Sequence, residues 1–82
     1  DLTLTWPPPG AGRFVALLAA AAPILPLGIY EMDGVLCLRF GPGYSLSIPP
    51  GLSAEEKDRF AAGAVMRSIA CLLPAHLRGD FA

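Results

Sequence analysis

A histidine and an aspartate lie close together near the end of the chain, in His76-Leu77-Arg78-Gly79-Asp80. A carboxylate beside an imidazole can orient it as a general base, so this pair is the first candidate for catalysis. His76 is the only histidine, and it follows the proline at position 74, where a histidine is typically a surface or helix-dipole residue. The surface interpretation is favoured, and we assign no catalytic residue.

Two other patterns resemble sites but lack essential parts. Gly10-Ala11-Gly12 precedes an expected helix, and backbone N–H groups at a helix N-terminus attract anions. The lysine of a P-loop and the third glycine of a dinucleotide fingerprint are missing, so a flexible helix entry is the favoured interpretation. Glu31 and Asp33 could act as the paired carboxylates of a glycosidase, but they flank an Asp-Gly turn and are typical of solvated turn residues.

Cysteine usage and charge exclude further classes of site. Cys37 and Cys71 lie far apart and belong to no metal-ligand spacing, so we predict two buried free thiols in a reducing compartment. His76 has no clustered nitrogen or sulfur ligand beside it, so neither a metal site nor a cofactor is predicted. The net charge of -1 and the scattered basic residues disfavour nucleic-acid binding.

The composition is unusually apolar for a small domain. The 82 residues are enough for one domain, residues 1–82, and are 54% hydrophobic and 16% charged, against a typical charged share of about 25%. Part of this apolar surface is therefore expected to pack on the rest of a larger domain, a second copy or a membrane surface. Prolines and a glycine interrupt the longest uncharged stretch, residues 14–30, so no transmembrane helix is predicted, and the amino-terminal residues do not resemble a signal peptide.

The elements that must position any site alternate between strands and helices. Residues 2–5 alternate as in a short strand, and the Ala- and Leu-rich segment from Gly12 to Ala22 predicts an apolar helix buried between a sheet and another layer. Segments 24–31 and 35–40 predict a hairpin around Asp33-Gly34. Tyr44 to Ile48 alternates as a further strand.

A second, amphipathic helix is predicted from Ser53 to Leu73. Ser53 and Glu56 form a capping box, and Pro74 ends the helix. The fold class is thus α/β, in the form of an α+β fragment. Its small, largely antiparallel sheet has three or four strands, with the apolar helix packed on it and the long amphipathic helix at the carboxyl end.

The order of these elements resembles the second half of a known enzyme family. The apolar helix, the segment Ala22-Pro23-Ile24-Leu25-Pro26-Leu27-Gly28-Ile29, and a strand ending in Phe40-Gly41-Pro42 follow one another. The same order is typical of the lysophospholipid and glycerolipid acyltransferases, which include the 1-acylglycerol-phosphate acyltransferases. The closing helix, with Val65-Met66-x-x-Ile69-Ala70-x-Leu72-Leu73-Pro74, also resembles that of some bacterial members.

This resemblance implies phospholipid biosynthesis, by acyl transfer from a thioester donor to a lysophospholipid acceptor. In the family a His-x4-Asp motif supplies the base, and a Glu-Gly-x-Arg motif holds the acceptor phosphate. Neither motif occurs here, and His76 and Asp80 are separated by three residues rather than four. The chain is therefore expected to be an inactive carboxyl-terminal fragment of an acyltransferase domain.

Only the proline-rich strand motif carries site residues onto this sequence. The resemblance implies that Pro23 and Pro26 line the substrate site, while the alternative is that Pro26 marks a bulge or a missing ladder bond in a buried strand. The family also implies a cytoplasmic location, compatible with peripheral contact at the inner face of the membrane.

Two readings from other classes remain open. One is a non-enzymatic α+β interaction module that forms homo-oligomers through the apolar helix or an open strand edge. The other is a small independent enzyme using His76 and Asp80, which would require a third polar group in the same pocket.

Overall fold

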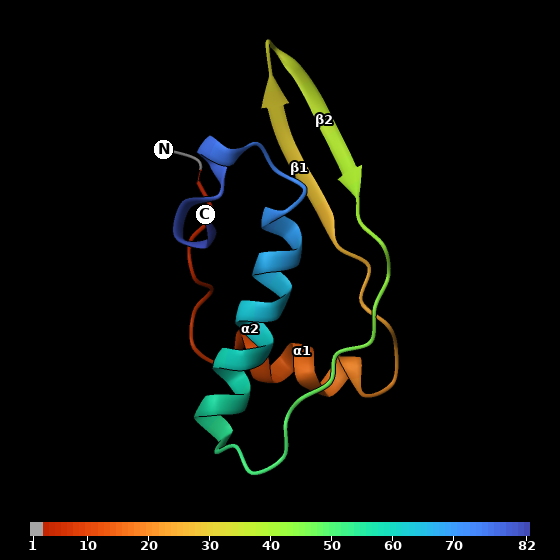
Figure 1. Cartoon of the computed structure of the whole chain (residues 1–82), viewed down its shortest axis with the longest axis vertical. Coiled ribbons are helices and arrows are strands. Elements are labelled where there is room, and N and C mark those ends of the chain that lie inside the picture. The colour runs from red at the N-terminus through yellow and green to blue at the C-terminus, as the bar shows by residue number, and fades with distance from the viewer. Residues whose placement is uncertain (1–2) are drawn as a thin grey trace.

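The chain forms a small α+β structure in a computed structural model that describes residues 3–82 (Figure 1). Two helices and one antiparallel pair of strands are followed by two short 3-10 helices. This confirms the mixed helix and strand class, with fewer strands than predicted. The elements are α1 (Ala11–Ala19), β1 (Leu27–Met32), β2 (Val35–Phe40), α2 (Ala54–Ala70), η1 (Ala75–Leu77) and η2 (Gly79–Phe81).

The predicted hairpin is confirmed. β1 and β2 pair antiparallel, with Met32 opposite Val35 next to the turn and Leu27 opposite Phe40 at the base. The two turn residues have positive φ angles, 52° at Asp33 and 77° at Gly34. Asp-Gly tolerates this conformation, and its twist matches that of the flanking strands, so the local sequence alone is sufficient to specify the turn.

The predicted strand from Tyr44 to Ile48 is reduced to a single bridge. Ile24 and Tyr44 exchange both backbone hydrogen bonds, at 2.7 and 2.9 Å, and residues 45–48 are irregular. Between this bridge and the base of the hairpin, residues 25–26 lie opposite residues 41–43. The second strand thus has one residue more than the first between these two points, which makes a bulge. Residues 41–44 therefore extend the hairpin and do not begin a new strand.

The predicted strand at residues 2–5 is wrong for its described part, because residues 3–5 are irregular; Leu2 lies outside the described residues. The Leu4 N–H donates to the Leu77 carbonyl at 3.1 Å, and the Asp80 N–H donates to the Leu4 carbonyl at 3.0 Å. The segment thus satisfies its backbone groups on the carboxyl-terminal 3-10 turns. An alternating pattern cannot distinguish this arrangement from pairing with a sheet.

The capping box at the start of α2 is confirmed. The Glu56 N–H donates to the Ser53 hydroxyl at 3.2 Å, and the Ser53 N–H donates to the Glu56 carboxylate at 2.8 Å. The helix ends at Ala70, earlier than the predicted Leu73, and turns lead to Pro74.

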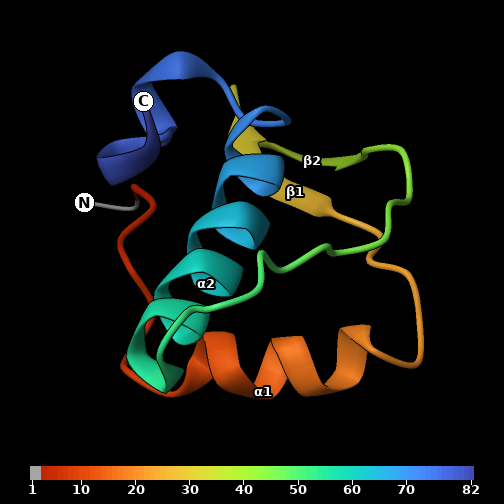
Figure 2. The ribbon, with the colours of Figure 1, turned by 60° about the horizontal axis from the view of Figure 1, so that its bottom comes forward.

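The helix α1 is shorter than predicted and is not buried between two layers. It packs on α2 near that helix's amino-terminal half, while the hairpin lies beside the carboxyl-terminal half (Figures 1 and 2). Phe14 and Leu17 are 63% and 72% exposed. The prediction of a buried helix is wrong because the two-stranded sheet does not extend over α1, which therefore has α2 as its main neighbour.

The core consists mainly of small side chains. The buried apolar residues are Ala61, Ala62, Ala70 and Leu73. Both cysteines are free as predicted, but Cys37 is only half-buried and Cys71 is exposed, so their predicted burial is wrong. Within residues 3–82, no helix is long and apolar enough to cross a membrane.

Candidate functional site

Pro26 occupies a ladder position immediately before β1 and is buried. Its carbonyl accepts a hydrogen bond from the Gly41 N–H at 3.0 Å, which continues the pairing of the hairpin by one position. Proline has no N–H to donate in return, so the regular strand begins only at Leu27. The alternative interpretation of Pro26, a missing ladder bond in a strand, therefore agrees with its position.

The ring of Pro26 packs in a region with no space for additional atoms. A Cβ added to Gly41 would lie 2.9 Å from Pro26 Cγ and 3.4 Å from the Leu72 side chain. A Cβ added to Gly28 would lie 2.9 Å from Leu72 Cβ. The two glycines thus allow the base of the hairpin to approach the chain that follows α2, and Pro26 fills the remaining volume.

Pro23 lies in a different environment. It is exposed, and it follows the turn that ends α1. In the part of the chain that the structure describes, neither Pro23 nor Pro26 lines any of four main surface cavities. The two residues expected to line a substrate site are therefore three positions apart in sequence but share none of these cavities.

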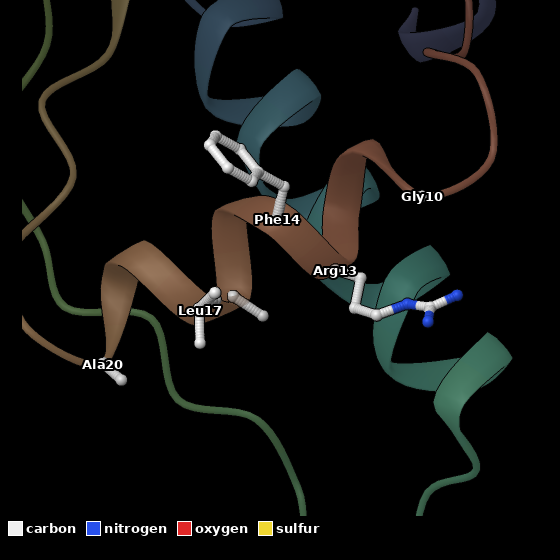
Figure 3. Close-up of a pocket in the computed structure, with 6 residues that line it drawn as sticks. Gly10, Arg13, Phe14, Leu17 and Ala20 are labelled. Carbon is white, nitrogen blue, oxygen red and sulfur yellow. The ribbon is translucent and has the colours of Figure 1, made fainter.

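An open depression lies on the exposed side of α1 (Figure 3). It has a volume of about 640 Å³ and is lined by residues from Gly10 to Ala20, among which Arg13 is the only charged one. Figure 3 shows the Arg13 side chain directed away from both Phe14 and Leu17. The depression is an open apolar surface, and its lining does not provide a base, a nucleophile and an oxyanion donor together.

A second cavity, of about 300 Å³, runs along the edge of β1. Its walls come from the irregular amino-terminal segment, from β1, and from the chain after α2. Glu31 is its only charged residue, and a single carboxylate without a partner does not define a reaction. The lining residues are Thr3, Leu4, Ile29, Tyr30, Glu31, Leu73 and Leu77.

The amino-terminal end of α1 does bind an anion, which is the carboxylate of Asp58 from α2. The Gly10 N–H donates to Asp58 Oδ2 at 3.0 Å, and the Arg13 N–H donates to Oδ1 at 2.7 Å. These bonds, that from Gly10 first, hold the pKa of Asp58 below its ordinary value of 3.8. The glycine pair thus serves to join the two helices, and the sequence alone did not identify Asp58 as its partner.

The carboxyl-terminal His76 and Asp80 do not form a catalytic pair. His76 is exposed on η1. The Asp80 carboxylate instead accepts a hydrogen bond from the Trp6 N–H at 3.3 Å, which ties the tail to the amino-terminal segment. Glu31 and Asp33 are both exposed beside the hairpin turn, as expected of turn residues. Among the described residues, no group of three or more metal-ligating side chains is gathered.

No protein-family model, no curated protein and no solved structure matches the chain.

Proposed function

We propose that this chain is the carboxyl-terminal part of a lysophospholipid or glycerolipid acyltransferase domain. The observation that carries the proposal is the order α1, β1, β2, α2, with the family-like residues at matching places in it. Pro23 to Ile29 lead into and begin β1, and Phe40-Gly41-Pro42 end β2. An apolar helix precedes them and a capped helix follows, as in the second half of that family.

Pro26 and Gly41 meet at the base of the hairpin. These residues belong to the two most characteristic segments, which lie 15 positions apart in the sequence (41 - 26) and meet through one backbone hydrogen bond and the proline ring. The register of the hairpin places residue 26 opposite residue 41, so the Asp33-Gly34 turn brings the two motifs together. Their contact gives both motifs a common structural purpose, which is to form the base of the hairpin.

The proposed role of the chain is to supply a wall of the lipid-binding region. The exposed apolar side chains of α1 and of the hairpin offer surface suited to an acyl chain or to the membrane that contains it. The parent enzyme would be cytoplasmic, with peripheral contact at the inner face of the membrane, in line with its lipid substrates.

The chemistry would be performed by the His-x4-Asp and Glu-Gly-x-Arg motifs of the parent. The histidine removes the proton of the acceptor hydroxyl, the oxygen attacks the thioester carbonyl carbon, and the C–S bond breaks to release the thiol after protonation. No residue of the present chain is assigned a part in these steps. The fragment alone is therefore expected to transfer no acyl group.

The test is to read the source DNA upstream of the codon for Asp1 and to assay the encoded protein. We expect His-x4-Asp followed by Glu-Gly-x-Arg, and transfer from oleoyl-coenzyme A to lysophosphatidic acid or another lysophospholipid. Replacing the motif histidine by alanine should lower the rate by at least about 100-fold. A start codon directly before Asp1 would overturn the proposal, as would an upstream sequence without these motifs.

A matched pair of variants, Pro26→Ala and Pro23→Ala, tests the role of the proline motif. In the active parent, Pro26→Ala should raise KM or lower kcat more than Pro23→Ala, because Pro26 is buried at the base of the hairpin and Pro23 is exposed. Equal effects of the two substitutions would show that both prolines act outside the packing described here.

A further inference from the structure

The outer edge of β2 presents unpaired backbone groups. The two-residue turn makes Met32 and Val35 a hydrogen-bonded pair, and such pairs then recur at every second position along the ladder. The bond between the Gly41 N–H and the Pro26 carbonyl continues this series. The N–H and C=O groups of the alternate residues, Leu36, Leu38 and Phe40, must therefore point away from β1.

Nothing in the described part of the chain pairs with this edge. No backbone hydrogen bond outside the hairpin involves residues 36, 38 or 40. Figure 1 shows β2 on the outer side of the hairpin, with β1 between it and the helices, and α2 packs on β1. Since unpaired N–H and C=O groups spaced along a strand are a template for another strand, the edge itself specifies the kind of partner.

The sequence of β2 protects this edge only weakly: its one charge is Arg39, which pairs with Gly28 on the face toward α2, and the bulge and Pro42 lie beyond the end of the strand. Natural edge strands are usually protected by lysine, proline, a bulge or an inward-pointing charge. Residues 35–40 read Val-Leu-Cys-Leu-Arg-Phe, with one charge, and Leu36 and Phe40 are 68% and 66% exposed. The opposite edge, on β1, is bounded by a cavity and by the amino-terminal segment, and contains Glu31.

We propose that the edge of β2 pairs with β2 of a second copy of this chain, antiparallel, about a two-fold axis at Leu38. Leu38 then lies opposite the partner's Leu38. Leu36 lies opposite the partner's Phe40, and by symmetry Phe40 lies opposite the partner's Leu36. These are three pairs that each exchange two hydrogen bonds, so every outward-pointing group of residues 36, 38 and 40 is used. The inference is independent of the acyltransferase proposal.

A second copy fits this edge in a register that keeps the single positive charges of the two strands apart. In the proposed register, Arg39 lies opposite the partner's Cys37, so the two guanidinium groups are not apposed. A register moved by one residue on each strand would place Arg39 opposite the partner's Arg39, and like charges in that position are destabilising. A register moved by one residue on each strand in the opposite direction would place Phe40 opposite Gly34 in the partner's turn, and one hydrogen-bonded residue pair would be lost.

The side chains of the joined strands also match. Leu36, Leu38 and Phe40 share one face of the hairpin with their cross-strand partners Glu31, Ile29 and Leu27, since alternate residues of a strand point to the same side, so this face is apolar except at Glu31 near the turn. The glycine at position 28 on the opposite face approaches Leu72 and Leu73, so the leucine-rich face is the one turned away from α2. Pairing two copies makes this apolar face continuous over four strands.

The expected dimer is weak, because strand pairing at one edge gives a small interface, below the roughly 1,000 Å² typical of stable complexes. Sedimentation equilibrium from about 5 to 500 μM should show a reversible rise from the 8.6 kDa monomer toward twice that mass. A species that remains monomeric at about 500 μM would overturn the proposal.

Two charge substitutions locate the interface. Leu38→Lys places two ammonium groups opposite each other at the two-fold axis and should weaken association at least about tenfold. Leu17→Lys, on the equally apolar and exposed face of α1, is the matched control and should leave association unchanged. The circular dichroism spectra of both variants should match that of the unmodified chain. Dissociation by Leu17→Lys but not by Leu38→Lys would assign the dimer to α1 and overturn the proposal.

Disulfide formation tests the register. In a Cys71→Ser background, Arg39→Cys places the new thiol opposite the partner's Cys37, at a non-hydrogen-bonded position where Cα atoms are about 4.5 Å apart. Mild oxidation should then give a covalent dimer in high yield. The Cys71→Ser chain with Cys37 alone should remain largely uncrosslinked, and efficient crosslinking through Cys37 alone would contradict the register.

Discussion

The junction of α1 with α2 differs from the β1–β2 hairpin in which kind of residue is buried: small residues are buried at the junction, whereas large apolar residues of the hairpin are exposed. At the junction, Gly12, Ala61 and Ala62 are buried, although none of them has a large apolar side chain. In the hairpin, Leu36, Leu38 and Phe40 are large and apolar but mostly exposed. Hydrophobicity alone therefore does not predict which residues of this chain are buried, because burial requires a neighbouring element at the right distance.

The reason is the close approach of the two helices. A Cβ on Gly12 would overlap the Asp58 carbonyl oxygen and lie 2.8 Å from the Ala62 nitrogen, so the helix backbones are almost in contact. The same approach brings Asp58 to the end of α1. Within residues 3–82, no element packs on the leucine-rich face of the hairpin in this way, so its apolar residues stay on the surface.

The largest effect is expected from Gly12→Ala. The added methyl group meets the backbone of α2, which cannot move aside as a side chain would, so α1 should separate from α2 at a cost of about 3 kcal/mol in the free energy of unfolding. Denaturant titration followed by circular dichroism measures this. Gly43→Ala is the control, since its Cβ would be at 3.6 Å from the nearest atom, an ordinary contact. Equal losses in the two variants would contradict the close approach at Gly12.

A smaller effect is expected from Asp58→Asn, and it should depend on pH. Because hydrogen bonding lowers the folded-state pKa of Asp58, its stabilisation is present above the ordinary value of 3.8 and is lost as the pH falls through the lower folded-state pKa. The variant should melt below the unmodified chain at pH 7, and the two melting temperatures should converge as the pH falls through the lowered pKa of Asp58. Glu55→Gln, on the same turn of α2, controls for general charge effects. A difference that persists at low pH would show that the charge of Asp58 is not the cause.

The smallest effect is expected in the hairpin. Val35→Thr keeps the shape of an exposed, β-branched side chain, so the free energy of unfolding should change by less than about 0.5 kcal/mol. Equilibrium unfolding at a concentration that keeps the chain monomeric provides the measurement. A loss of about 2 kcal/mol or more, on the scale of a core substitution, would mean that Val35, which lies on the face opposite Leu36, Leu38 and Phe40, packs against a neighbour in the folded chain.

Local signals in the sequence predicted several elements well. The Asp33-Gly34 turn and the Ser53–Glu56 capping box depend on backbone conformation and hydrogen bonds within four residues, and both are present. The predicted strands at residues 2–5 and 44–48 depended on alternation alone. Residues 3–5 instead bind the 3-10 turns, and the other segment forms one bridge, since a strand exists only where another strand is available to pair with it.

For the candidate site, too, some features could be predicted from the sequence and others could not. The sequence placed Pro26 in a strand, and its missing N–H made a break in the ladder foreseeable. Its contact with Gly41 and its separation from any cavity shared with Pro23 could not be read from spacing. The family resemblance, which carries the proposed function, likewise comes from the order of residues and elements.

The sequence by itself determined the helices, the hairpin turn, the helix cap and an excess of apolar residues, because each depends on neighbours along the chain or on composition. Tertiary structure decided which apolar residues are buried, which carboxylate binds the end of α1, and which strand edge is left open. These depend on distances between segments far apart in sequence, and local propensity contains no information about such distances.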